Sequence, residues 1–379
     1  MAENPLFIKR KIDTKIQEYL KLPEILAIVG PRQSGKTTYL KHLISEKKGS
    51  FISFEDRDIL SLFNNDIKGF AERYVIDANL LCIDEFQYAK AGGKNLKYIF
   101  DTHPGIKIII SGSSAIDLTV HALKYLVGRV IVLDFWPFDK DELMTVFPSF
   151  TKKQIYEYYS TFGGYPRVAI SKNDEERRVI LKNIYNTYFL REVKDILGLV
   201  DEYKIQRLLT YLAQSVGSLI QYSKIANACD LPERDVRNYL EFMNKTFVAY
   251  QARPFFTNKL KEIIKQPKIY FFDSGFLNHV LSYEVDAGKK LEQIVIMELL
   301  KKGFNIKYWR DKQKREMDFV VFNDMKVITA LESKSGGKTS QSFFAFKKNY
   351  PAISASVVTH EDVFKVIDAL VLRRCDLGT

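Results

Sequence analysis

EILAIVGPRQSGKT, residues 24–37, is the stretch that decides the fold of the first part of this chain. Its first six residues form a short apolar run suited to a buried parallel strand, and a GxxxxGK[ST] loop follows at once. In such a loop the backbone N–H groups converge on phosphate oxygens, at the positive end of the helix that follows. The stretch predicts a nucleotide-binding P-loop, with Lys36 on the β- and γ-phosphates of ATP and the Thr37 hydroxyl on Mg²⁺. The residues predicted to bind the nucleotide are Gly30, Pro31, Arg32, Gln33, Ser34, Gly35, Lys36, Thr37 and Thr38.

A second apolar run, residues 80–83 (LLCI), ends in two carboxylates, Asp84 and Glu85. We expect Asp84 to hold Mg²⁺ through water. Glu85 lies one residue farther along, where a carboxylate can polarise the water that attacks ATP, as a general base does. A solvated acidic turn at the end of a strand is the alternative interpretation.

Two further features could contact the γ-phosphate. The apolar run 106–110 leads into a polar stretch in which Ser113 or Ser114 would sense the phosphate from an intervening strand, unless it only caps the next helix. Arg129 precedes the β-branched run VIVLDF and is a candidate arginine finger, acting on its own nucleotide or on that of a neighbouring subunit. A surface arginine without a catalytic role is the alternative for Arg129.

The whole chain has 379 residues, which predicts two or three domains, and a net charge of +11, which suits a polyanionic partner such as DNA. No stretch reaches the length of about 18 apolar residues that a membrane span needs, and the N-terminal residues lack an apolar signal core, so we expect a cytoplasmic protein. Three cysteines without CxxC spacing indicate neither a disulfide framework nor a zinc site.

The first 145 residues resemble the AAA-type ATPases of archaea and bacteria that carry a C-terminal domain of uncertain function. The matching text is GPRQSGKTT, FISFEDRD, LLCIDEFQ, IIISGSSA, LVGRV and LDFWPFDKDEL, in that order. The later stretches GGYP, YFLREV and KIYFFDSGF extend the resemblance. It implies ATP, Mg²⁺ and a RecA-like parallel sheet with helices on both faces, and it leaves the substrate and any homo-oligomer open.

The middle of the chain predicts helices, broken by GGYP at residues 163–166. A helix at 203–216, a short helix at 223–230 and a longer one at 231–240 precede the strand-like FVAYQARPFF. This order suggests a winged helix-turn-helix. Arg234, Arg237 and Asn238 would lie on the outer face of its second helix, where they could contact DNA or simply face solvent.

The C-terminal part predicts the order αβββαβ, with a helix at 289–302, strands NIKYWR, MDFVVF and VITALESK, a helix at 341–349 and strand SASVVT. This order is the core arrangement of PD-(D/E)XK nucleases. Asp318 and Glu332 would ligate Mg²⁺ or Mn²⁺, Lys334 would stabilise the attacking hydroxide, and Glu292 would orient metal-bound water. The proline that names the superfamily is replaced by Met317, and an acidic-x-basic pair is also a common plain ion pair.

These patterns predict an α/β protein with three domains: a P-loop ATPase domain at 1–148, a helical connector with a winged helix at 149–265, and a nuclease-like domain at 266–379. The function they favour is Mg²⁺-dependent ATP hydrolysis coupled to action on DNA. A nucleotide-controlled switch that engages a protein partner, with an inactive nuclease-like scaffold, is the main alternative.

Overall fold

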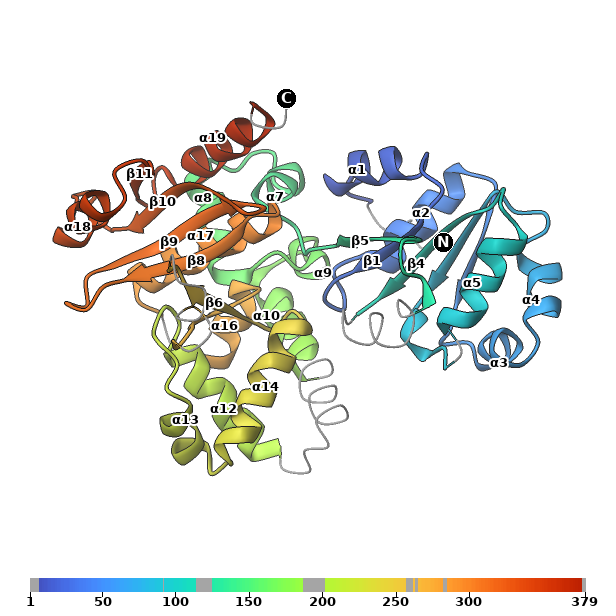
Figure 1. Cartoon of the computed structure of the whole chain (residues 1–379), viewed down its shortest axis with the longest axis horizontal. Helices are drawn as coiled ribbons and strands as arrows, with labels where there is room; N and C mark the ends of the chain where they lie inside the picture. Colours follow the sequence, from blue (N-terminus) through green and yellow to red (C-terminus); the bar gives the residue numbers. More distant parts are fainter. Residues whose placement is uncertain are drawn as a thin grey trace. The chain divides into compact units, whose positions relative to one another are not determined.

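Figure 1 shows the computed structural model of the chain, which describes residues 7–90, 92–113, 125–186, 202–256, 262, 265–281 and 285–376. The chain divides into two compact units. Unit 1 comprises Met1–Phe138 with Lys245–Phe247, and unit 2 comprises Asp139–Asn244 with Val248–Thr379.

Unit 1 is built on a five-stranded parallel sheet with the strand order β2-β3-β4-β1-β5. The strands are β1 Ile25–Val29, β2 Gly49–Ser53, β3 Leu80–Asp84, β4 Lys107–Gly112 and β5 Val130–Asp134. All five residues of β1 and of β3 are buried, as expected for strands that are covered on both faces. The parallel α/β architecture predicted from the sequence is confirmed.

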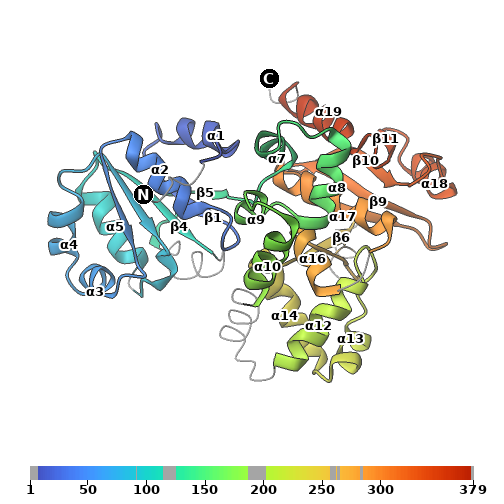
Figure 2. The same ribbon diagram turned by 180° about the vertical axis from the view of Figure 1, so that it is seen from behind.

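Helices cover both faces of this sheet (Figures 1 and 2). One face packs against α1 and α2, which contribute Ile16 and Leu40 to the same apolar cluster as Leu26 and Ile28 of β1. The helices of unit 1 are α1 Ile12–Tyr19, α2 Lys36–Glu46, α3 Arg57–Asn65, α4 Ile67–Tyr74, the 3₁₀ helix η1 Phe86–Tyr88 and α5 Gly92–Thr102. Burial of each large apolar side chain in such a core contributes about 1.5–3 kcal/mol.

Unit 2 is built on a six-stranded mixed sheet with the order β11-β10-β9-β8-β6-β7. Its strands are β6 Ala249–Pro254, β7 Lys268–Phe271, β8 Asn305–Arg310, β9 Glu316–Asn323, β10 Lys326–Ser333 and β11 Ala355–Val358. The strands β8, β9 and β10 form an antiparallel meander, and β11 runs parallel to β10. The predicted order of helices and strands in the C-terminal part is present.

The predicted domain boundary between residues 265 and 266 falls inside unit 2. Strand β6, which the sequence assigns to the wing of the middle domain, pairs in parallel with β8, and it pairs antiparallel with β7. Backbone hydrogen bonds therefore join the middle and C-terminal segments into one sheet, which lies within unit 2.

The first predicted boundary, after residue 148, likewise falls inside unit 2. Helix α7 (Lys140–Val146) belongs to unit 2, because buried ion pairs attach its N-terminus there. Lys302 Nζ lies 2.5 Å from Asp139 Oδ2, and the backbone N–H of Lys140 donates to Glu298 Oε1 at 3.1 Å. Unit 2 therefore begins at Asp139.

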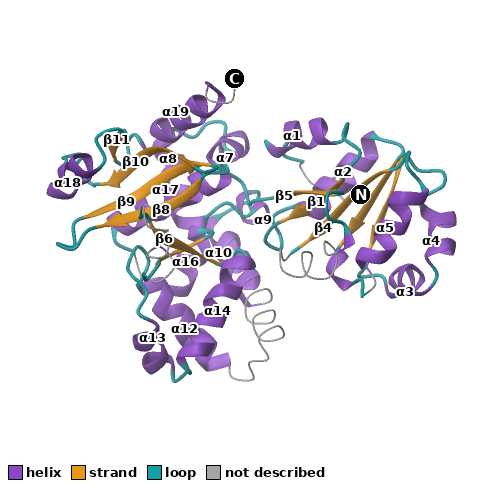
Figure 3. Ribbon diagram, viewed as in Figure 1, coloured by secondary structure: helices purple, strands orange, loops and turns teal. Residues whose placement is uncertain are grey.

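The other helices of unit 2 cover its sheet and continue into a helical part (Figure 3). They are α8 Lys152–Phe162, α9 Pro166–Ala169, α10 Asp174–Ile184, α12 Glu202–Gln214, α13 Tyr222–Cys229, α14 Glu233–Lys245, α16 Ser274–Leu281, α17 Ala287–Lys301, α18 Gln341–Asn349 and α19 Val363–Asp376. The predicted helix break at residues 163–166 lies between α8 and α9, and the YFLREV stretch falls outside the described residues. Within the described part of the chain, no helix is both long and apolar enough to cross a membrane.

Candidate nucleotide site and charged sites of unit 2

The P-loop joins β1 to α2 at the carboxyl edge of the five-stranded sheet. Gly35, just before α2, has φ 97°, a left-handed conformation that favours glycine. A Cβ atom on Gly30 would lie 2.1 Å from the carbonyl oxygen of Phe135, so only glycine fits the close approach of these two backbones. Of the predicted nucleotide-binding residues, Pro31, Ser34 and Lys36 are buried, Arg32 is half-buried, and Gln33, Thr37 and Thr38 are exposed.

The ammonium of Lys36 lies inside this loop. Lys36 Nζ donates to the carbonyl oxygens of Gly30 and Pro31, each at 2.8 Å. The Oγ atom of Ser34 is buried and has no hydrogen-bond partner among the described residues. A buried cation and an unpaired hydroxyl in a loop of this shape fit the phosphate groups of a nucleotide.

The two residues predicted to hold Mg²⁺ are adjacent. Thr37 Oγ1 donates to Asp84 Oδ2 at 2.6 Å, although the two residues are 47 positions apart in the chain. Ser111 of β4 donates to the other carboxylate oxygen, Asp84 Oδ1. Hard oxygen ligands of this kind suit Mg²⁺. Sequence reasoning missed Ser111, because only the position of β4 next to β3 brings its hydroxyl to Asp84.

Glu85 follows Asp84 at the end of β3, in a left-handed conformation with φ 54°. Gln87 Nε2 donates to Glu85 Oε2 and lies 3.5 Å from Ser113 Oγ. Burial, and then the charge of Asp84, raise the pKa of Glu85, while Lys36, Gln87 and Arg32 lower it. Gln87, which the sequence analysis did not single out, therefore lies next to both Glu85 and Ser113. Ser114 lies outside the described residues.

A buried arginine supports the P-loop from the N-terminal segment. Arg10 donates to the carbonyl oxygen of Ser34 at 2.9 Å and to that of Trp136 at 2.5 Å. Its guanidinium also lies 4.4 Å from the centre of the Phe135 ring. Arg10 therefore links the loop to the segment after β5. Nothing in the local sequence distinguishes it from the neighbouring lysines.

Arg129 lies near the amino end of β1, whereas the P-loop follows the carboxyl end of the same strand. The backbone N–H of Ile25, the first residue of β1, donates to the Arg129 carbonyl at 2.8 Å. The P-loop begins after Val29, about 13 Å away at 3.3 Å per residue. The Arg129 side chain pairs with Asp101 at 3.3 Å. The structure does not bring Arg129 to the P-loop of its own chain.

The three residues predicted to contact DNA lie on α14, and all three are exposed. Arg237 Nη2 forms an ion pair with Glu233 Oε1 at 2.5 Å, and the Arg237 guanidinium lies 3.8 Å from the centre of the Tyr222 ring. Arg234 and Asn238 project from the same helix. Three acidic and three basic residues balance the charge of α14.

The four residues of the predicted nuclease-like site are brought near one another only in part. Ser333 N donates to Asp318 Oδ2 at 2.9 Å, and Lys334 Nζ lies 3.3 Å from the buried Glu332 Oε1. Glu292 Oε2 accepts a hydrogen bond from the Tyr270 hydroxyl at 2.8 Å. Over the described ranges, no group of three or more His, Cys, Asp or Glu side chains is arranged to hold a metal ion.

A lysine that the sequence did not single out occupies the centre of these carboxylates. Lys268 Nζ lies 2.5 Å from Glu316 Oε1, 3.3 Å from Asp318 Oδ1 and 3.8 Å from Glu292 Oε2. Burial lowers the pKa of Lys268, but the three carboxylates outweigh burial and raise it above its usual value. A buried ammonium group therefore offsets part of the negative charge of the acidic cluster.

The geometry at the edge of β1, β3 and β4 is that of a P-loop ATPase, and residues 22–144 match the AAA domain family. Unit 1 is thus a P-loop domain of the AAA type, which supports ATP binding and hydrolysis. Residues 153–287 match the Domain of unknown function (DUF8612), and residues 287–374 match the Domain of unknown function (DUF4143).

Uncharacterized proteins from other organisms are similar to this chain over most of its length. An uncharacterized protein of Haemophilus influenzae is 22% identical over 93% of this chain and 92% of its own. An uncharacterized protein of Methanocaldococcus jannaschii is 27% identical over 86% of this chain and 78% of its own. Among solved structures, the ADP form of the Aeropyrum pernix ORC2 protein is 12% identical, with a TM-score of 0.34, over 65% of this chain and 88% of its own. A TM-score this low supports no conclusion about function.

Proposed function

We propose that this protein is a Mg²⁺-dependent ATPase that acts on DNA. The observation that carries the ATPase part is the meeting of Lys36, Thr37, Asp84 and Glu85 at one edge of the sheet. Residues from two separate segments of the chain form this group, which brings together the cation, the metal ligands and the base that phosphoryl transfer to water requires.

The nucleotide supplies the γ-phosphoryl group, and Mg²⁺ neutralises charge on its oxygens. Thr37 and Asp84 would hold the metal ion. Lys36 would leave the carbonyl oxygens of Gly30 and Pro31 and bind phosphate oxygens with the same ammonium. Since Gln87 restrains Glu85 Oε2, the other carboxylate oxygen is left to accept the proton of the attacking water.

Action on DNA is supported by the order of elements in the middle of unit 2. Helices α12, α13 and α14 are followed by the antiparallel pair β6 and β7, and single bridges join Val216 and Leu219 to β7. This is the order of a winged helix-turn-helix, in which α14 would enter the major groove and present Arg234, Arg237 and Asn238. The net charge of +11 favours such a partner.

We propose that the C-terminal part grips DNA without cutting it. The order of its elements agrees with a nuclease-like core, but Lys268 places a positive charge among Glu292, Glu316 and Asp318. A divalent cation at the same carboxylates would have to displace this buried ammonium. The nuclease roles predicted for Glu292, Asp318, Glu332 and Lys334 are tested by incubating plasmid DNA with Mg²⁺ or Mn²⁺. Any nicking that Asp318→Ala abolishes contradicts the proposal.

Steady-state ATP hydrolysis with Mg²⁺, measured with and without duplex, single-stranded and branched DNA, tests the main proposal. The Lys36→Ala variant subtracts contaminating activity, and Lys41→Ala, an exposed lysine of α2, is the matched control. We expect stimulation by one DNA form that declines steeply with salt. Hydrolysis that depends on Lys36 but ignores all three DNA forms would favour the switch that engages a protein partner.

A further inference from the structure

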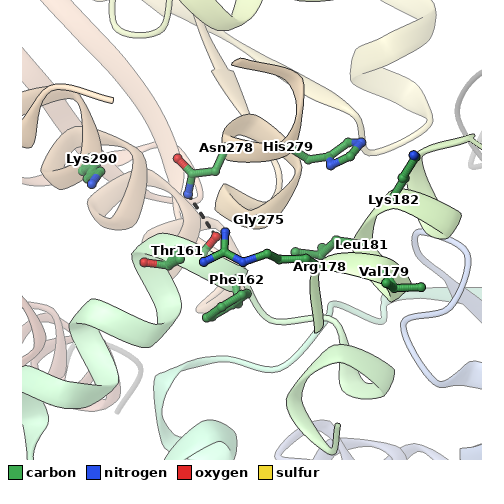
Figure 4. Close-up of a pocket in the computed structure, with 10 residues that line it drawn as sticks. All are labelled: Thr161, Phe162, Arg178, Val179, Leu181, Lys182, Gly275, Asn278, His279 and Lys290. Carbon is green, nitrogen blue, oxygen red and sulfur yellow. Dashed lines mark hydrogen bonds between the residues drawn. The ribbon is translucent and has the colours of Figure 1, made fainter. Parts of the chain in front are cut away.

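Unit 2 contains an open cavity with a volume of about 680 Å³ that is surrounded by basic side chains (Figure 4). Four helices line it, α8, α10, α16 and α17, and all of them belong to unit 2. Arg178, Lys182, His279 and Lys290 contribute to its wall. None of the described lining residues carries a carboxylate.

Helix geometry explains why these cations gather. Arg178, Lys182 and Tyr185 are spaced by four and three residues, so they share one face of α10 and of the residues just after it. This face is turned to α16, where the His279 ring lies 4.9 Å from that of Tyr185. In Figure 4 the Arg178 side chain extends toward Thr161 and Gly275.

Contacts with the backbone at the end of α8 fix the position of α16 at the floor of the cavity. Asn278 Nδ2 donates to the carbonyl oxygens of Ser160, at 2.5 Å, and Thr161, at 3.0 Å, at the end of α8. A Cβ atom on Gly275 would lie 2.2 Å from the Phe162 carbonyl oxygen, so α16 begins in direct contact with the end of α8. The cavity is therefore preformed, which lowers the entropic cost of binding a ligand.

The two cations that α10 contributes to the cavity, Arg178 and Lys182, have no acidic partner among the described residues. The Lys182 ammonium makes no hydrogen bond or ion pair within the described part of the chain, and the Arg178 guanidinium contacts the Phe162 ring at 5.6 Å. The nearby Asp174 is already paired with Arg177, and Glu176 accepts from the backbone N–H of Lys172.

The positive charge of the cavity also affects the pKa of the histidine in its wall. Burial, and then the charge of Lys182, lower the pKa of His279, and no carboxylate opposes them. A cavity with this charge attracts an anion, and the planar guanidinium of Arg178 matches phosphate oxygens in a bidentate manner.

We propose that this cavity binds a phosphorylated ligand of nucleotide size. Its volume falls within the roughly 300–1,000 Å³ of small-ligand sites. Phe162, Val179 and Leu181 supply apolar surface for a base or a sugar, while Arg178 and Lys182 supply the phosphate contacts. The site goes beyond the proposed ATPase, because the described residues that line it all belong to unit 2. Its ligand is either a free nucleotide or one nucleotide unit of a nucleic acid.

Two fluorescent probes distinguish these sources: N-methylanthraniloyl AMP and a 5′-fluorescein-labelled dT12. Both are titrated in full-length Lys36→Ala protein, so that binding at the P-loop is weakened equally in every sample. The test variant is Arg178→Gln/Lys182→Gln. The control is Lys152→Gln/Lys153→Gln, which removes the same charge from exposed residues at the other end of α8. All four side chains are exposed, so both double variants are expected to fold.

We expect the test variant to bind at least one probe at least tenfold more weakly, while the control changes affinity by less than twofold. Loss confined to AMP identifies a free nucleotide as the source, and loss confined to dT12 identifies nucleic acid. The proposal is overturned if neither probe binds, or if the two double variants bind both probes alike. With Lys36 intact, Arg178→Gln/Lys182→Gln should hydrolyse ATP at the wild-type rate without DNA. This measurement keeps a failure of the cavity proposal separate from a failure of the ATPase proposal.

Discussion

Replacing Lys268 by Met should destabilise unit 2 by about 3–5 kcal/mol, because breaking a buried ion pair leaves its partner charge uncompensated. The side chain of Lys268 is 2% exposed, and its ammonium lies within 3.8 Å of three carboxylates. Met has a similar length but no charge. Glu292, Glu316 and Asp318, whose side chains are only 13–23% exposed, would then repel one another without a cation between them.

Unfolding in urea, followed by tryptophan fluorescence, measures this loss. The chain has two tryptophans, and Trp309 is buried in unit 2. In a Trp136→Phe background, fluorescence therefore reports on unit 2 alone. With an m-value of about 3 kcal/mol/M, the urea midpoint should fall by about 1–1.7 M. The matched control is Lys204→Met, which removes an ion pair in unit 2 to Asp230, whose side chain is 79% exposed and stays solvated, and we expect a much smaller shift of the midpoint.

The loss should depend on pH in a defined direction. Burial raises the pKa of Glu292 to about 7, and Lys268 opposes this rise. Without Lys268 the pKa of Glu292 in the folded variant moves higher still. Between the ordinary glutamate pKa of 4.5 and this raised pKa, the folded variant binds a proton that the unfolded chain has released. Stability of the variant therefore falls as the pH rises through this interval. The destabilisation should be larger at pH 8 than at pH 5.

Two results would refute this reasoning. One is a loss below 1 kcal/mol at pH 8, and the other is an equal loss at pH 5 and pH 8. The double variant Lys268→Met/Glu316→Gln removes the closest carboxylate as well, and it should recover at least 1 kcal/mol. If it recovers nothing, lost packing rather than uncompensated charge explains the effect.

Three further predictions concern the nucleotide site. Glu85→Gln should lower the rate of ATP hydrolysis by at least about 100-fold, as expected for loss of a general base, and change ATP affinity less than threefold; an equal loss in both would assign Glu85 to binding. Because the Gln87 hydrogen bond lowers the pKa of Glu85, Gln87→Ala should move the acid limb of the pH–rate profile to higher pH, and an unmoved limb would show that Glu85 does not control it. If Arg129 serves a neighbouring subunit, Arg129→Ala should abolish hydrolysis and mixing it with Lys36→Ala should restore part of the activity; no recovery on mixing would count against that role.

Much of the nucleotide site could be predicted from the sequence, because local backbone chemistry determines it. A glycine-rich loop between an apolar strand and a helix can curl in few ways, and Gly30 and Gly35 have the conformations that this loop requires. The acidic residues at the end of β3 were recognisable for the same reason. The αβββαβ order of the C-terminal part also followed from local patterns of alternating and periodic apolar residues.

Only the tertiary structure decided which distant residues share a site. Ser111 reaches Asp84 because β4 lies beside β3, and Arg10 reaches the P-loop from a segment that precedes the first strand. Lys268 lies among three carboxylates because β6 and β7 extend the C-terminal sheet, which joins the middle and C-terminal segments of the chain. A local pattern records the conformation of a few neighbouring residues. Strand order and the pairing of buried charges depend on packing between segments far apart in the chain, and no single stretch of this sequence contains that information.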